Sequence, residues 1–272
     1  MTSLALEGVG FVYPDGTRAL TGVDLTIGSG ECIAIVGQNG SGKSTLVRHL
    51  DGLLRPTEGR VLHDGVDIVG ARVAELAAQV GIVFQNPDRQ IFAGKVRSEV
   101  EFGPRILGRP AALAAATAAE ALEAVGLTDL ADANPYDLGY SRRKLLTVAS
   151  ILAMGTAVVV LDEPTTGQDA RGVARIQRVI ADLYANGRTI IAISHDMRFV
   201  AETFERVVVM GAGRILLDGS PADVFAEPAW PTLAATYLEP PLAARTGAPL
   251  GLGPTPTEAA LVEALASRSR PG

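Results

Sequence analysis

Residues 32–50 read CIAIVGQNGSGKSTLVRHL, and this stretch decides the fold. Its first five residues are apolar and have the length of a buried strand, and residues 45–54 repeat apolar side chains at helical spacing. Between them lies the pattern G-x-x-x-x-G-K-[ST], whose glycines allow backbone N–H groups to converge on phosphate oxygens. Because this pattern joins a strand to a helix N-terminus, it predicts a phosphate-binding loop rather than a glycine-rich turn without a ligand.

The residues expected to hold the phosphates belong to this phosphate-binding loop and the first turn after it. Lys43 is expected to reach the terminal phosphates, and the hydroxyl of Ser44 is expected to ligate Mg²⁺. The complete predicted set from this stretch is Gly37, Asn39, Gly40, Ser41, Gly42, Lys43, Ser44 and Thr45.

A second motif, AVVVLDEP at residues 157–164, supplies two acids at the end of an apolar strand. Open α/β sheets place their chemistry at the carboxyl ends of strands, so Asp162 is expected to hold Mg²⁺. Glu163 is expected to orient a water molecule and take its proton during attack on a γ-phosphate. The alternative for this acidic pair alone is a helix N-cap ahead of Pro164.

The order of the remaining elements predicts a mostly parallel sheet. Residues 32–36, 80–84, 157–161 and 189–194 are apolar runs of strand length, as parallel sheets covered on both faces require. Helical patterns over residues 72–79, 111–125, 142–154 and 170–185 separate them. Residues 4–13 and 23–27 alternate around the turn Pro14-Asp15-Gly16, which predicts an antiparallel opening. Residues 95–154 contain no strand-like run and are expected to form a helical insertion.

Composition excludes several classes of protein. The 272 residues carry 24 basic and 30 acidic side chains, a net charge of −6 without a basic block, so nucleic acid is not an expected partner. The single cysteine, Cys32, excludes an internal disulfide framework and favours a reducing cytoplasm. No apolar run reaches the roughly 18 residues of a membrane span, and the first residues do not resemble a signal peptide.

Proline is concentrated near the C-terminus, with eight of the sixteen prolines from Pro228 onward. This change predicts a domain over residues 1–227 and an extension over residues 228–272. Within the extension, residues 257–265 are expected to form a helix whose N-cap is Thr257.

These motifs together resemble the nucleotide-binding subunit of ATP-binding-cassette (ABC) transporters over residues 3 to about 225. The resemblance implies that Tyr13 stacks on adenine and that Gln85 links Mg²⁺ and the attacking water to the helical insertion. It also implies that Asp169 belongs to a loop that crosses the dimer and that His195 contacts the γ-phosphate. The fold class implied is a P-loop NTPase, α/β, with an antiparallel β subdomain and a helical subdomain.

Two further stretches are similar to ATPase subunits of energy-coupling factor (ECF) transporters, which import vitamins and transition-metal ions. QNPDRQIF at residues 85–92, followed by VRSEVEFGPRILG, resembles the corresponding stretch of those subunits. The extension resembles the tail through which those subunits contact one another. In these transporters the membrane partner inserts helices carrying arginines here, so docking is expected over residues 85–103, with Asp88, Glu99 and Glu101 as candidate acids.

The chain departs from the family at its signature, Leu-Ser-Gly-Gly-Gln, which contacts the ATP bound by the other subunit. Here Leu138 is followed by a variant signature, Gly139, Tyr140, Ser141 and Arg142. Ser141 is expected to cap the following helix, and Arg142 is expected to offer charge to the phosphates. Loss of a hydroxyl at position 139 predicts an asymmetric pair in which the site on this signature is the slower one.

The sequence therefore predicts an ATP- and Mg²⁺-dependent ATPase on the cytoplasmic face of the membrane. Its expected partners are a second ATPase subunit, a transmembrane coupling subunit and a substrate-binding membrane subunit. Two alternatives remain at this point: a soluble ABC ATPase that acts on nucleic acid or the ribosome, and a regulatory subunit that binds nucleotide without hydrolysis. The transported substrate is not encoded in these motifs.

Overall fold

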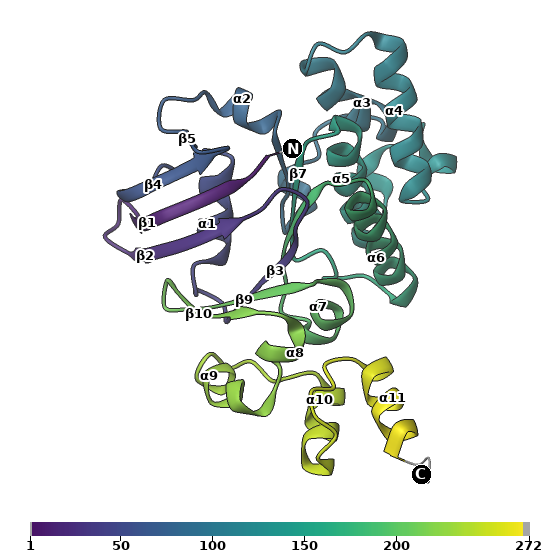
Figure 1. The fold of residues 1–272 in the computed structure, drawn as a ribbon. Coiled ribbons are helices and arrows are strands. Elements are labelled where there is room, and N and C mark those ends of the chain that lie inside the picture. The colour runs from purple at the N-terminus through teal and green to yellow at the C-terminus, as the bar shows by residue number, and fades with distance from the viewer. Residues whose placement is uncertain (1, 269–272) are drawn as a thin grey trace.

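The computed structural model describes residues 2–268, which form two sheets with helices around them (Figure 1). The larger sheet has six strands in the order β10–β9–β3–β8–β7–β6. Five of these strands are parallel, and β10 pairs antiparallel with β9 at one edge. The strands are β3 (Cys32–Val36), β6 (Val80–Val83), β7 (Val158–Asp162), β8 (Thr189–Ile193), β9 (Arg206–Gly211) and β10 (Arg214–Gly219).

Both faces of the larger sheet are covered, which explains its uninterrupted apolar strands. Along β3, Cys32, Ala34 and Val36 belong to one hydrophobic cluster, whereas Ile33 and Ile35 belong to another. Successive side chains of a strand point to opposite faces, so a strand buried between two layers is apolar at every position. The predicted parallel α/β core is confirmed, although β9 and β10 were not anticipated by the apolar runs.

The smaller sheet is antiparallel, with the order β2–β1–β4–β5. Its strands are β1 (Leu4–Val12), β2 (Arg18–Ile27), β4 (Glu58–His63) and β5 (Val66–Asp67). The predicted opening hairpin is confirmed, since Leu4 pairs with Ile27 and the chain turns between Val12 and Arg18. Its buried side chains, such as Leu6 and Leu25, share a hydrophobic cluster with Leu46 of the helix after β3.

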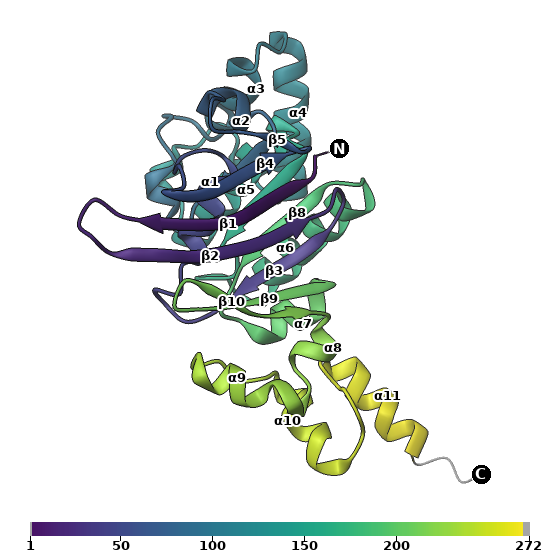
Figure 2. The same cartoon turned by 60° about the vertical axis from the view of Figure 1, so that its left-hand side comes forward.

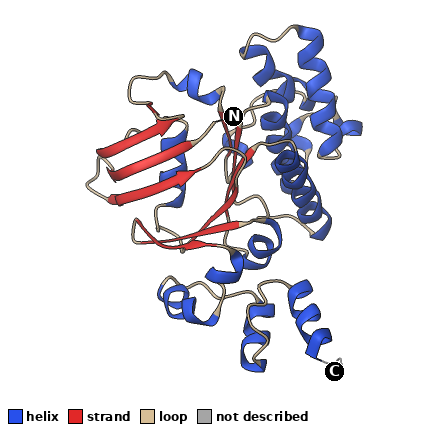
Figure 3. Ribbon diagram, in the orientation of Figure 1, coloured by secondary structure: helices blue, strands red, loops and turns tan. Residues whose placement is uncertain are grey.

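The helices cover the sheets and build a separate lobe (Figure 3). The regular elements within residues 95–154 are the α-helices α3, α4 and α5 and two short 3₁₀-helices, and together they form the helical lobe. The helices up to β9 are α1 (Lys43–Leu50), α2 (Val73–Ala77), α3 (Val96–Ile106), α4 (Ala111–Ala124), α5 (Tyr140–Met154), α6 (Ala170–Ala185) and α7 (Met197–Thr203). Among residues 2–268, no helix is long and apolar enough to cross a membrane.

The C-terminal segment folds as short helices at the end of the molecule opposite α3 and α4 (Figure 2). They are α8 (Pro221–Val224), α9 (Trp230–Ala235), α10 (Leu242–Gly247) and α11 (Glu258–Arg268). The Thr257 hydroxyl accepts a hydrogen bond from Ala260 N at 3.1 Å, so the predicted N-cap is confirmed. Leu233, Leu238 and Ala244 share a hydrophobic cluster with Phe225, so a boundary near residue 227 stays a prediction.

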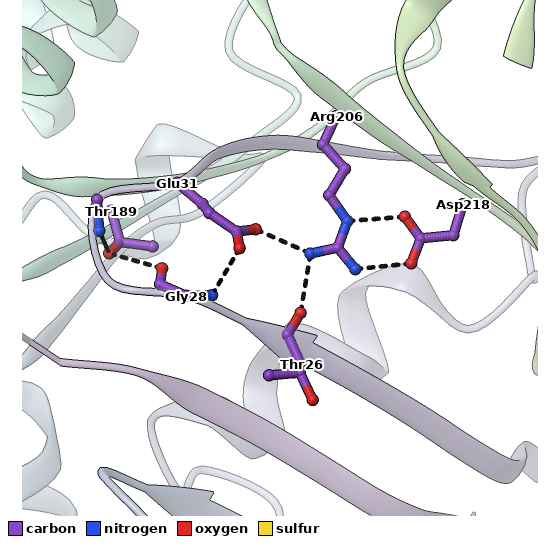
Figure 4. Close-up of polar contacts among 7 residues, drawn as sticks. Thr26, Gly28, Glu31, Thr189, Arg206 and Asp218 are labelled. Atoms are coloured by element: carbon purple, nitrogen blue, oxygen red, sulfur yellow. Dashed lines mark hydrogen bonds and ion pairs between the residues drawn. The ribbon is translucent and has the colours of Figure 1, made fainter. Parts of the chain in front are cut away.

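Arg206 of β9 connects the two sheets (Figure 4). Its Nε and Nη2 donate to the Asp218 carboxylate, each at 2.7 Å. Its Nη1 donates to Thr26 O of β2 at 2.9 Å and to Glu31 at 2.8 Å, and Glu31 also accepts from Gly28 N. The hydrogen bond with Asp218 is the main cause that raises the pKa of Arg206. The bidentate ion pair joins β9 to β10 within the larger sheet and fixes the guanidinium, and the Nη1 bond to Thr26 O extends from there to β2 of the smaller sheet.

Candidate active site

The phosphate-binding loop lies between the end of β3 and the start of α1. Gly42 is the N-cap residue of α1 with φ = 102°, a left-handed conformation that favours glycine. A Cβ at this position would also lie 2.6 Å from Ala19 O of β2. Glycine is therefore required here both by the backbone conformation and by the close approach of the smaller sheet.

Lys43 is the first residue of α1, and its ammonium lies across the phosphate-binding loop. The Nζ donates to Gly37 O at 2.7 Å and to Gln38 O at 2.9 Å. The side chain is only 8% exposed, and this burial lowers the pKa of Lys43, while Glu163 and Asp162 act in the opposite direction. A desolvated cation at the N-terminus of a helix is suited to bind anions.

The acidic motif follows β7 in the predicted place. Asp162 is the last residue of β7, and Glu163 follows with φ = 52°, a conformation that is uncommon outside glycine. Glu163 N donates to Ile193 O at 2.9 Å, which anchors the turn to β8. Left-handed backbone held in this way is frequent at functional sites, where surrounding structure supports it.

Glu163 is paired with His195, which lies two residues beyond the end of β8. The distance between Glu163 Oε2 and His195 Nδ1 is 2.7 Å. Burial is the largest influence on the Glu163 carboxylate and raises its pKa, whereas His195 lowers it and Asp162 raises it further. A carboxylate with a raised pKa is a stronger base, so this arrangement suits proton transfer from water.

A cavity of about 260 Å³ lies between the smaller sheet and the phosphate-binding loop. The predicted residues that line it are Tyr13, Asn39, Gly40, Gly42, Lys43, Ser44, Thr45, Gln85, Asp162 and Glu163. The Tyr13 hydroxyl lies 2.9 Å from the Thr45 hydroxyl, so the ring stands at the rim beside α1. Ser41 is buried within the loop and contacts Lys43 Nζ at 3.4 Å instead.

A larger cavity of about 710 Å³ adjoins this one. It is lined by Gly37, Asn39, Glu163 and His195 together with Tyr237 and Arg245 of the C-terminal segment. The structure thus places Glu163 on the wall shared by both cavities, whereas His195 lines the larger cavity.

The oxygen ligands proposed for a metal face one space. Ser44, Gln85 and Asp162 line the same cavity. Burial is the main cause that raises the pKa of Asp162. Within residues 2–268 no cluster of three or more His, Cys, Asp or Glu side chains could hold a metal ion. One hydroxyl, one amide and one carboxylate fit Mg²⁺, which takes few protein ligands alongside phosphates.

The variant signature forms the N-terminus of α5, and its contacts correct one prediction. Gly139 is the N-cap residue and provides no side-chain cap, so the expectation that Ser141 caps this helix is wrong. The Ser141 hydroxyl instead donates to Gln168 Oε1 at 2.8 Å, and Gln168 Nε2 donates back to Ser141 O at 3.1 Å. The Tyr140 hydroxyl donates to Gln85 O at 3.3 Å, and Arg142 is exposed.

The loop after Glu163 also has its own local role. The Asp169 carboxylate accepts from Gly172 N at 2.7 Å and is the N-cap of α6. The Asp169 side chain therefore forms a hydrogen bond within its own chain. Its neighbour Gln168 forms the reciprocal pair with Ser141. Gln168 was not anticipated from the sequence, because nothing local reports a contact with a residue 27 positions away.

Two of the three acids expected at the docking segment are not surface groups. Glu99 is 4% exposed, and its carboxylate accepts from Phe92 N and Ala93 N at 3.0 and 2.7 Å. Glu101 is 7% exposed and is paired with Arg105. The expectation that these two acids receive a partner's arginines is therefore wrong. Asp88 is exposed and forms an ion pair with Arg143 at 3.0 Å.

Comparisons with known proteins identify the family of this chain. The sequence profile of the family described as "ABC transporter" matches residues 20–166. The energy-coupling factor transporter ATP-binding protein EcfA of Methanothermobacter thermautotrophicus is 40% identical over 224 residues, 82% of this chain and 72% of that protein. A Methanosarcina acetivorans protein named as an ABC transporter ATP-binding protein is 45% identical over 88% of this chain, which spans only 39% of that protein.

Solved structures give the same family. CbiO1 from Clostridium perfringens, part of the ABC transporter complex cbiONQ, superimposes with a TM-score of 0.75 and 37% identity over 85% of this chain and 93% of that chain. A dimeric ATP-binding cassette bound to ADP and Pi superimposes with a TM-score of 0.74 and 26% identity, over 80% of this chain and 98% of that chain. The chain therefore belongs to the ABC transporter family, within which it is an ATP-binding cassette with ATPase activity.

Proposed function

We propose that the chain is the ATPase subunit of an ECF-type membrane importer and acts as a peripheral protein on the cytoplasmic face of the cell membrane. The observation that carries this proposal is the convergence of Lys43, Asp162 and Glu163 on one cavity at the carboxyl ends of the parallel strands. The relatives named EcfA and the similarity to CbiO1 support the importer class.

In the proposed reaction the phosphate-binding loop and the N-terminus of α1 hold the triphosphate of ATP. Lys43 places its desolvated positive charge against the terminal phosphates. Glu163 orients a water molecule for attack on the γ-phosphate and takes its proton, while the hydrogen bond from His195 keeps the carboxylate in place. General-base assistance of this kind accelerates a reaction by about 10²- to 10⁴-fold.

The proposed cofactor is Mg²⁺, held by Ser44, Asp162 and Gln85. When bound, it neutralises charge that develops on the phosphate oxygens. Ser44 and Asp162 line the same cavity, so the hydroxyl and the carboxylate can both contribute oxygen ligands to one ion. Gln85 adds an amide oxygen from the segment after β6, which connects the site to the helical lobe.

The proposed partners are a second ATPase subunit, a transmembrane coupling subunit and a substrate-binding membrane subunit. The signature residues 139–142 and Asp169 face the second ATPase in this arrangement. The coupling subunit docks over residues 85–103, where Phe92 and Phe102 form an exposed pair with ring centroids 4.6 Å apart. An exposed aromatic pair is a suitable anchor for a partner helix. Asp88 is the acid that remains at the surface.

Cysteine cross-linking tests this docking site in the assembled complex. The native Cys32 is buried, so a cysteine introduced as Phe92→Cys would be the accessible thiol of this chain. We expect it to cross-link to the coupling subunit. Val262→Cys, at a position that is 65% exposed on α11, is the matched control and should not link to that subunit. Linking exclusively through position 262 would contradict the docking proposal.

The importer class is tested by purification of the tagged chain from its native membranes in mild detergent. An ECF-type complex should contain a second ATPase and apolar multi-span proteins. Two substrate-translocating permeases with a lipoprotein would assign the chain to another class of importer.

A further inference from the structure

Lys144, in the second turn of α5, is fully buried although it carries an ammonium group. Its Nζ donates to Asp162 O at 2.8 Å and to Phe84 O and Gln85 O, each at 2.9 Å. An ammonium has three N–H donors, so each donor has one backbone carbonyl as its acceptor. The side chain therefore joins α5 to the ends of two neighbouring strands.

The burial of this group is costly, which makes a purely space-filling role a poor explanation. Desolvation lowers the pKa of Lys144 to about 8, although the charges of Asp162 and Glu163 act in the opposite direction. A buried ammonium without sufficient partners is strongly destabilising, and an apolar side chain of the same length would fill the space without this penalty.

The three carbonyls lie beyond the last residue pair that joins β6 to β7, although Asp162 still pairs with Ile193 of β8. The register between β6 and β7 ends at the pair Val83 and Leu161. Phe84, Gln85 and Asp162 follow directly after that pair, so backbone pairing between these strands does not fix their relative placement. The Lys144 ammonium bonds to all three residues at this point.

We propose that Lys144 is a positioning residue of the ATPase site, which holds the Gln85 and Asp162 backbones together so that their side chains stay aligned across the cavity. The inference rests on the proposed roles of Gln85 and Asp162. Because the contact reaches both residues from α5, it also ties the helix that carries the signature to the nucleotide cavity. Misplacement of a catalytic group by about 1 Å can reduce a rate by roughly 100-fold.

The test compares Lys144→Met, which keeps the length but removes all donors, with Arg188→Met in the full chain. Arg188 also donates to backbone carbonyls, those of Gly155 and Thr156 at the other end of α5, and is the matched control. We expect Lys144→Met to lower kcat roughly 10- to 100-fold. The KM for ATP should stay within about threefold, because the phosphate-binding loop is intact. Arg188→Met should leave kcat unchanged.

Lys144→Gln is a second variant for the case that the methionine variant does not fold. Its amide has two donors, so it cannot bond to all three carbonyls, and kcat should fall less than with methionine. In the double variant with Gln85→Ala, the loss should not exceed that of the larger single variant by more than about twofold, because both changes act on one element.

Amide hydrogen exchange gives a readout that is independent of turnover. The peptide that contains Gln85 should exchange faster in Lys144→Met than in Arg188→Met, with nucleotide absent. Unchanged kcat in Lys144→Met, a rise in KM alone, or multiplicative losses in the double variant would overturn the proposal. A Gln85→Ala variant with full turnover would remove the proposed role of Gln85 and this inference with it, whereas the importer assignment rests on separate experiments.

Discussion

Glu163 and His195 are 32 residues apart in the sequence, and the structure places His195 Nδ1 2.7 Å from Glu163 Oε2. Neighbouring strands cause this contact, since Asp162 of β7 pairs with Ile193 of β8. The Glu163 side chain is 9% exposed and that of His195 is 69% exposed. The pair thus connects a buried base to the open surface of the larger cavity.

This geometry predicts the result of Glu163→Gln. The variant should bind ATP nearly as tightly as the wild type, because Lys43 and the phosphate-binding loop are unchanged. Hydrolysis should fall by about 100-fold or more, because glutamine cannot accept the proton. Nucleotide binding and single-turnover hydrolysis, measured on the same preparation, check both expectations. Turnover above about a tenth of the wild-type rate would be too fast for loss of a general base.

Lys43→Ala should have the opposite effect and abolish tight nucleotide binding. Hydrogen bonds to charged groups contribute about 1.5–3 kcal/mol each, so the Kd for ATP should rise at least roughly tenfold. Lys95→Ala, which removes an exposed lysine of the helical lobe, is the control and should leave the Kd unchanged. Equal Kd values for the two variants would exclude Lys43 as the main phosphate ligand.

Much of the core could be predicted because its signals are local. The strand, loop and helix of residues 32–50 combine an apolar run, required glycines and a helical repeat within one short stretch. In contrast, β4 is buried only at Val61 and His63, with Leu62 half-buried between them, so its alternation is weak. Its place is determined by pairing with β1, which no local pattern reports.

The site likewise contains residues that local motifs predict and one residue whose role depends on distant contacts. Lys43, Asp162 and Glu163 belong to contiguous motifs, and the structure brings them to one cavity. Lys144 follows two arginines and reads as a solvated basic residue, yet it is fully buried. Its carbonyl partners are 18 to 60 residues away in the sequence. Every residue has a backbone carbonyl, so the residue types at these positions do not reveal that they accept a hydrogen bond. Contacts of this kind require the folded structure.

Asp51, after the last turn of α1, predicts a pH dependence of stability. Burial raises the pKa of its carboxyl to about 6, while a hydrogen bond from Leu53 N acts in the opposite direction. Between the ordinary pKa of 3.8 and about 6 the folded state binds more protons than the unfolded state, so stability falls as pH rises through this window. Above it, the full cost of the buried charge is present.

Asp51→Asn should therefore raise the free energy of unfolding at pH 7.5 by up to about 3 kcal/mol and have little effect near pH 4. Denaturant unfolding of the nucleotide-free chain at both pH values measures this. Asp67→Asn is the matched control, because the exposed Asp67 carboxylate makes the same kind of bond to Val69 N. An equal dependence of the free energy of unfolding on pH in both variants would contradict the assignment of this effect to the buried Asp51 carboxyl.

The variant signature predicts weak ATPase activity of the isolated chain that rises when a second ATPase subunit is added. In an ABC dimer each nucleotide site is completed by the signature of the other subunit. Both the hydroxyl and the carbonyl of Ser141 are bonded to Gln168, so Ser141 does not replace the hydroxyl missing at position 139. One lost bond to a charged group costs about 1.5–3 kcal/mol, or roughly 10- to 150-fold in rate when it acts on the transition state.

Gly139→Ser tests this explanation directly, because a side chain fits at this position. Gly139 has φ = −63° and ψ = 158°, and a Cβ placed on it meets no atom within 4 Å. The serine should therefore raise turnover of the isolated chain, whereas Gly139→Ala, which adds the same Cβ without the hydroxyl, should not. Because the two variants differ by one oxygen atom, a rise confined to serine assigns the effect to the hydrogen bond. Vigorous turnover by the wild-type chain alone, with no gain from serine, would show that the variant signature is fully competent in a homodimer and would exclude the asymmetric pair.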